Sequence, residues 1–77
     1  MEEILTYLAR ELVDDPDQVR VERLEREDGE LVLELHVAPE DVGKVIGKQG
    51  RIARALRTVV KASAVRAGRR VHVEIAA

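Results

Sequence analysis

Residues 45–52, with the sequence VIGKQGRI, constrain the fold of this chain more than any other segment. Apolar residues at helical spacing lead up to Gly47 and resume after Gly50. This pattern predicts a helix that is interrupted by a four-residue turn and then restarts. The two glycines leave the main chain bare, and Lys48 and Arg51 beside them favour an anionic ligand. The alternative is a plain corner between two helices, in which glycine only permits a positive φ angle.

Two common nucleotide-binding loops do not fit these glycines. A Walker loop requires four residues between its glycines and a Lys-Ser or Lys-Thr pair at its end. Gly43 and Gly47 have only three residues between them, and Gln49 follows Lys48. A dinucleotide-binding fingerprint requires Gly-x-Gly, whereas position 45 is valine. The sequence therefore excludes a P-loop ATPase and a Rossmann dehydrogenase.

Charge is divided unevenly along the chain. Residues 1–40 contain 13 acidic and 4 basic residues, a net charge of −9, whereas residues 41–77 contain 2 acidic and 9 basic residues, a net charge of +7. Such an asymmetry points to a polyanionic partner for the basic half. Ordinary solvated helix surface is the alternative interpretation.

Length and composition indicate one small domain over residues 1–77. Its core must consist of Val, Leu, Ile and Ala, because Tyr7 is the one aromatic residue. A core of this size stabilises a chain only modestly, so a dimer is plausible. The absence of cysteine excludes disulfides and thiolate metal sites. With no signal peptide or membrane-spanning run in the sequence, we expect a cytoplasmic protein without membrane contact.

Periodicity predicts helices over 2–13, from Pro39 to just before Gly47, and over 51–66, and strands from Val19, over 31–37 and over 71–75. Asp28-Gly29 predicts a two-residue hairpin turn, and Leu24 breaks the alternation of the first strand, which suggests a bulge or a register change there. Pro39 suits the first position of its helix, with Glu40 and Asp41 at the positive end.

The predicted order is therefore α-β-β-α-α-β, an α+β fold. The two-helix crossover should place the last two strands parallel, giving a three-stranded mixed sheet with three helices on one face and solvent on the other. On the 51–66 helix, the residues expected to face inward are Ile52, Leu56, Val59, Val60 and Ser63.

The turn Ile46-Gly47-Lys48-Gln49-Gly50 between two helices resembles the Gly-x-x-Gly motif of KH domains, and the element order is similar to the prokaryotic type II KH fold over essentially the whole chain. The resemblance implies a groove that holds about four nucleotides of single-stranded RNA. Ile46 and Val73 are candidates for its apolar floor. The expected RNA-binding residues are Ile46, Gly47, Lys48, Gln49, Gly50, Arg51 and Arg54, with Arg57 and Lys61 extending the basic surface.

The resemblance is strongest to small bacterial single-KH RNA-binding proteins. It implies an RNA-chaperone-like regulator, linked to bacterial cell shape and division, that forms a homodimer or pairs with a larger KH-containing protein. A protein-interaction module is the alternative function. Because residues 41–77 contain no aromatic side chain to stack on bases, a single copy should bind weakly.

Other residues do not indicate catalysis. His36 and His72 alternate away from the leucines, with Glu34 and Glu74 beside them, and are expected to be polar residues on the solvent face of the sheet rather than metal ligands. No nucleophile-base constellation is present, so we expect neither an enzyme nor a cofactor. The acidic residues are expected in turns and on exposed strand edges.

Overall fold

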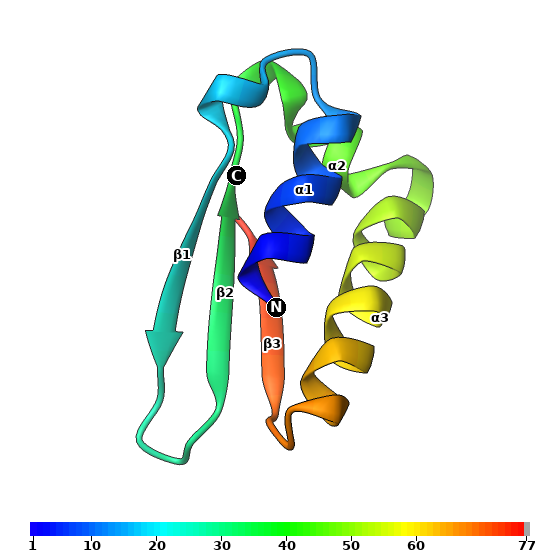
Figure 1. Cartoon of the computed structure of the whole chain (residues 1–77). Helices are drawn as coiled ribbons and strands as arrows, with labels where there is room; N and C mark the ends of the chain where they lie inside the picture. Colours follow the sequence, from blue (N-terminus) through cyan, green and yellow to red (C-terminus); the bar gives the residue numbers. More distant parts are fainter. Residues whose placement is uncertain (77) are drawn as a thin grey trace.

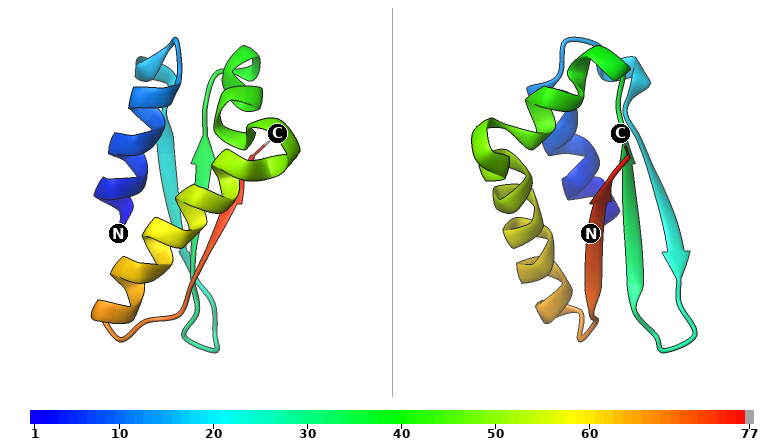
Figure 2. Two further views of the ribbon diagram at one scale, coloured as in Figure 1. Left: turned by 90° about the vertical axis from the view of Figure 1, so that its right-hand side faces the viewer. Right: turned by 180° about the vertical axis from the view of Figure 1, so that it is seen from behind.

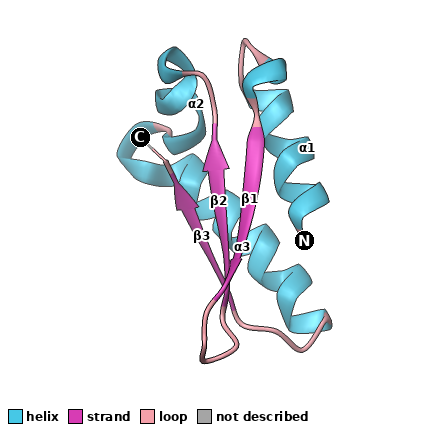
Figure 3. Cartoon of the chain, turned by 90° about the vertical axis from the view of Figure 1, so that its left-hand side faces the viewer, coloured by secondary structure: helices cyan, strands magenta, loops and turns pink. Residues whose placement is uncertain are grey.

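The computed structural model describes residues 1–76, and its helices and strands follow the predicted order (Figure 1). They are α1 (Glu2–Leu12), β1 (Arg20–Glu25), β2 (Leu31–His36), α2 (Val42–Ile46), α3 (Arg51–Arg66) and β3 (Val71–Ile75). The strands lie in the order β1-β2-β3, with β1 antiparallel and β3 parallel to the central β2. All three helices lie on one face of this mixed sheet (Figures 2 and 3), which confirms the predicted α+β arrangement.

The central strand β2 carries the core. Leu31, Leu33 and Leu35 have no exposed surface, and Val71 and Val73 of β3 lie in register with the first two of these leucines. From Leu33 to His36 apolar and polar residues alternate, because the helices cover one face of the sheet and leave the other free. Val32 departs from this pattern, since it lies on the free face and is nevertheless only 4% exposed.

Small residues determine how α3 packs on the sheet. Its buried residues are Ala53, Leu56, Val60 and Ala64. The prediction that Val59 lies on the inner face is wrong, because Val59 is 38% exposed, and Ser63 is only partly buried. Ala53 and Ala64 take the inner positions instead, since their short side chains let the helix approach the strands closely. Val59 is turned about 100° away from Val60, toward α1.

The hairpin between β1 and β2 differs from the predicted two-residue turn. The Arg26 N–H donates to the Glu30 carbonyl (2.8 Å) and the Gly29 N–H donates to the Arg26 carbonyl (3.0 Å), so three residues form the loop. Gly29 has φ 87°, the left-handed conformation that ends such a loop. The Asp28 carboxylate accepts the Glu30 N–H (3.0 Å), and this side-chain bond favours the longer loop.

The suggested bulge at Leu24 is not present. The register of β1 with β2 runs without interruption from Arg20 opposite His36 to Glu25 opposite Leu31. Leu24 therefore lies on the outer face of the sheet and is 57% exposed. The irregular sequence pattern arises from an apolar residue that faces solvent.

The start of α2 is later than predicted. Pro39–Asp41 form a 3₁₀ turn, and the α-helix begins only at Val42. Asp41 is fully buried, in contrast to the expectation that the acidic residues lie in exposed turns and edges. Within residues 1–76, each helix is too short or too polar to span a lipid bilayer.

Candidate nucleic-acid interface

The corner between α2 and α3 has main-chain angles that few residue types tolerate. α2 ends at Ile46, and Gly47 follows with φ 75° and ψ 174°, a region essentially restricted to glycine. Gln49 (φ 57°, ψ 25°) and Gly50 (φ 74°, ψ 16°) are both left-handed, and α3 begins at Arg51. The predicted interruption and restart of the helix is confirmed. A strained non-glycine residue, Gln49, lies at its centre.

The two glycines of the turn are required for different reasons. A Cβ atom at Gly47 would lie 2.6 Å from Cγ1 and 2.9 Å from Cβ of Ile52, too close for either atom. A Cβ atom at Gly50 would meet no atom within 4 Å. Gly47 thus allows α2 to pack against the first turn of α3, whereas Gly50 leaves open space on the outside of the corner.

The corner presents main-chain groups to solvent. Lys48 and Gln49 are both exposed, and within residues 1–76 neither main-chain N–H group donates to a turn, loop or side-chain acceptor outside the helices. The Gly50 N–H donates to the Gly47 carbonyl (3.1 Å), and the Arg54 guanidinium donates to the Gln49 carbonyl (3.3 Å). Exposed main-chain N–H groups next to a lysine are suited to binding one anion.

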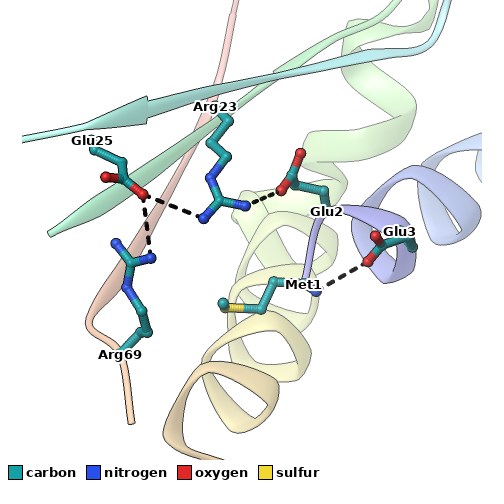
Figure 4. Close-up of polar contacts among 6 residues, drawn as sticks. All are labelled: Met1, Glu2, Glu3, Arg23, Glu25 and Arg69. Atoms are coloured by element: carbon teal, nitrogen blue, oxygen red, sulfur yellow. Dashed lines mark hydrogen bonds and ion pairs between the residues drawn. The ribbon is translucent and has the colours of Figure 1, made fainter. Parts of the chain in front are cut away.

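Many basic residues elsewhere are neutralised by acidic neighbours. Basic side chains in ion pairs with Asp or Glu are Arg20, Arg23, Arg26, Lys44, Arg69 and Arg70. Figure 4 shows one such network, in which Arg23 bonds to Glu2 (2.6 Å) and to Glu25 (3.4 Å). Glu25 also accepts a hydrogen bond from Arg69 (3.3 Å). These guanidinium groups already have anionic partners.

The basic residues of the corner and of α3 have no such partners. Within residues 1–76, no ion pair involves Lys48, Arg51, Arg54, Arg57 or Lys61. The excess positive charge of the second half of the sequence is therefore concentrated where it is free to attract a polyanion.

Three of these free residues form a stripe on α3. Arg54, Arg57 and Lys61 are spaced three and four residues apart, so they share one side of the helix. The Arg57 Nε donates to the Val73 carbonyl (3.2 Å), which places this side next to β3. Arg51 lies three residues before Arg54, about 60° from it around the helix. It also lines a hollow beside Leu8 of α1, so it borders both the stripe and that hollow.

The two residues suggested as an apolar floor have different environments. Ile46 is 36% exposed at the end of α2 and is available to a ligand. Val73 is 1% exposed and belongs to the core, because its side chain lies on the inner face of β3 between the other buried residues. Its carbonyl group accepts the hydrogen bond from Arg57.

A buried carboxylate, which the sequence pattern did not reveal, fixes the position of α2. Asp41 accepts hydrogen bonds from the Asp15 N–H (3.0 Å) and from the Lys44 ammonium (3.1 Å), and Lys44 also bonds to Asp14 (2.6 Å). Burial would raise the pKa of Asp41, but the hydrogen bonds from Lys44 and from the main chain of Asp15 and Asp14 outweigh it and hold this pKa below its usual range. The start of α2 is thereby tied to the loop after α1.

An apolar strip lies between α1 and α3. A hollow between these helices is lined by Leu8, Leu12, Ile52, Ala55, Leu56 and Val59, together with Glu11 and Arg51. A second hollow continues it along Ile4, Val59, Ala62, Ser63 and Arg66. We call these lining residues the α1–α3 strip. The pairing of two distant helices creates it, so no single segment of the sequence indicates it.

The comparisons with known proteins agree with this fold. The family model described as "KhpA/KhpB, KH domain" matches residues 2–75. The "RNA-binding protein KhpA" of Clostridium acetobutylicum is 57% identical over 75 residues, which cover 97% of this chain and 99% of that protein. Proteins with the same name from Aquifex aeolicus and Bacillus subtilis are 52% and 45% identical, each over 97% of this chain and over 94% and 91% of their own lengths. No solved structure gave a significant match. The chain therefore belongs to the KhpA/KhpB family of KH domains.

Proposed function

We propose that this chain binds single-stranded RNA at the corner between α2 and α3. The observation that carries the proposal is the exposed corner itself, where the exposed main chain of Lys48 and Gln49 adjoins a set of basic residues without acidic partners. The similar proteins are named as RNA-binding proteins rather than as enzymes, which supports the same interpretation.

The corner would hold the sugar-phosphate backbone by main-chain and charge contacts. One phosphate fits against the N–H groups of Lys48 and Gln49, and the open space beside Gly50 lets the strand approach closely. Arg54 and Lys61 would attract the following phosphates along the side of α3 that lies next to β3. Contacts of this kind position a strand without reading its sequence.

Bases would contribute less than phosphates. Ile46 is the exposed apolar side chain beside the corner, and residues 41–77 contain no aromatic ring. Stacking on an aromatic ring is worth about 1–3 kcal/mol per base, so its absence predicts weak binding by one copy. A weak, sequence-tolerant binder suits the RNA-chaperone-like regulator that we infer from the family, with a role in cell shape and division.

The test is a charge reversal at the tip of the corner. Lys48→Asp combined with Gln49→Asp should abolish RNA binding and preserve the fold, because aspartate tolerates the left-handed angles of position 49. Fluorescence anisotropy with a labelled random-sequence pool of single-stranded RNA, and with the matching DNA pool, measures the effect and the preference for ribose.

The matched control is Gln18→Asp combined with Arg20→Asp, which changes the net charge by the same amount at the start of the edge strand β1 and in the turn before it. The control should retain most of the affinity. If both variants have native circular dichroism spectra and bind RNA with equal affinity, the corner is not the RNA-binding site.

The α1–α3 strip favours a second property, self-association. Leu12, Val59 and Ile4 are 37–38% exposed along one continuous apolar surface, which is unusual for a small monomer. We infer that a second copy of the chain covers the strip. Since α1 and α3 run in opposite directions, Glu11 lies at one end of the strip and Arg66 at the other (Figure 1). A two-fold axis near Val59 would bring each Glu11 toward Arg66 of the second copy.

Two substitutions of the same type on the same helix test this inference. Val59→Lys should dissociate the dimer, whereas Val65→Lys should not, because Val65 is 77% exposed and lies outside the strip. Sedimentation velocity with and without RNA provides the readout. The inference that a second copy covers the strip is refuted if the wild type is monomeric. It is also refuted if the strip binds only a larger KH-containing protein.

A further inference from the structure

The outer face of the sheet carries a row of carboxylates in register. Glu22 of β1 lies opposite Glu34 of β2, and Glu34 lies opposite Glu74 of β3. Like charges directly opposite each other destabilise a sheet. From the sequence we expected only solvated polar residues on this face. The register adds that all three strands place the same negative charge at the same level.

A histidine lies within this row. The Nε2 atom of His36 is 2.7 Å from Oε1 of Glu34 and 3.9 Å from Oε2 of Glu22. One ligand atom from each of these three residues lies within 4.8 Å of the other two. Glu34 and His36 are partly buried, and the second carboxylate oxygen of Glu22 is oriented by Arg20 at 3.0 Å. The three side chains therefore converge instead of spreading into solvent.

We propose that Glu22, Glu34 and His36 bind one divalent transition-metal ion, of which Zn²⁺ fits best. One imidazole nitrogen and two carboxylate oxygens are ordinary zinc ligands, and water would complete the tetrahedron. Magnesium and calcium prefer sites made of oxygen atoms alone, so the histidine selects against both.

The geometry needs only small adjustments. Around a tetrahedral zinc ion with bonds of about 2.1 Å, two ligand atoms lie about 3.4 Å apart. The pair formed by Glu34 and His36 must open by about 0.7 Å, and the pair formed by Glu22 and His36 must close by about 0.5 Å. Rotations of long glutamate side chains at a surface accommodate such shifts. On binding, the ion takes the place of a proton at Nε2 of His36, which then bonds to the metal through its lone pair.

His72 provides an internal control. It lies on the same face, with Nε2 3.4 Å from Oε1 of Glu74, but this pair has no third ligand within reach among the described residues. The proposed site also lies on the face of the sheet that the helices leave free, away from the corner that we assign to RNA (Figure 3). Metal binding should therefore be independent of RNA binding.

The experiment is a titration of the full chain, without an affinity tag, with zinc chloride in a non-coordinating buffer at neutral pH, followed by calorimetry and by NMR of the imidazole signals. The wild type should bind one ion per chain, and the signals of His36 should shift while those of His72 do not. His36→Gln and Glu34→Gln should each weaken binding at least about tenfold, since loss of even an outer-shell partner costs about that much. His72→Gln should bind like the wild type.

The inference fails if the wild type takes up no zinc saturably, or if His36→Gln and His72→Gln bind with equal affinity. The variant with Lys48→Asp and Gln49→Asp keeps this test separate from that of RNA binding. It should bind zinc normally even though it does not bind RNA.

Discussion

The two glycines of the corner should respond very differently to alanine. At Gly47, alanine must adopt a main-chain conformation nearly unique to glycine, which destabilises the fold by about 1–3 kcal/mol. Its methyl group also overpacks against Ile52, which costs about a further 1–3 kcal/mol. At Gly50 only the left-handed strain remains, about 1–2 kcal/mol. Alanine also lowers the conformational entropy of the unfolded chain, and this effect stabilises the folded state by about 0.4–1 kcal/mol at each position. We expect a loss of about 3 kcal/mol for Gly47→Ala and about 1 kcal/mol for Gly50→Ala.

Urea denaturation followed by circular dichroism measures both values. A chain of this length has a total stability of about 4–12 kcal/mol, so Gly47→Ala removes a large share of it. Adding Ile52→Ala should recover part of the loss, because it removes the Cγ1 atom 2.6 Å from the new methyl group. Equal losses at the two glycines, or no coupling between positions 47 and 52, would refute the assignment of Gly47 to helix packing.

Two further predictions concern charge. The lowered pKa of Asp41 means that its contribution to stability is present above the unfolded pKa of about 3.9 and is lost as the pH falls through the lower folded value. Wild type should therefore exceed Asp41→Asn in urea midpoint at pH 7, with a gap that closes in acid below about pH 4; a gap independent of pH would contradict this. Replacing Arg54 or Lys61 by Gln should each reduce the salt dependence of RNA binding by about 0.7 in a plot of log K against log salt. Arg69→Gln should leave that slope unchanged, because Arg69 is already paired with Glu25. If Arg69→Gln lowers the slope as much as Arg54→Gln does, the distinction between free and paired basic residues is wrong.

Local sequence patterns predicted the elements because each reflects a local cause. The alternation from Leu33 to His36 arises because the helices cover only one face of the sheet, and the glycines of the corner occupy main-chain angles that most other residues avoid. The resemblance to KH domains rested on the same corner. The parallel pairing of the last two strands then followed from the two-helix crossover that joins them.

The incorrect predictions concern features that are determined by tertiary contacts. The orientation of Val59 depends on how closely Ala53 and Ala64 let α3 approach the sheet, which periodicity does not reveal. The burial of Asp41 depends on the Asp15 N–H of a distant loop, which together with Lys44 of α2 satisfies its carboxylate. The hairpin loop is longer than predicted because the Asp28 carboxylate accepts a hydrogen bond from the Glu30 N–H.

The composition of the candidate site was also only partly predictable. The sequence identified the basic half, but only the structure shows that Arg69 and Arg70 are paired while Arg54, Arg57 and Lys61 are not. Arg69 and Arg70 are paired because the acidic hairpin lies next to them, although it is about 40 residues away in the sequence.

The most direct test of the central claim is an NMR titration of the ¹⁵N-labelled chain with single-stranded RNA. We predict that the largest amide shifts fall on Lys48, Gln49 and Gly50, followed by residues along the stripe of α3. The amides of β1, at the far edge of the sheet, should barely move. Large shifts confined to β1 or to the α1–α3 strip, with the corner unchanged at saturation, would contradict the account.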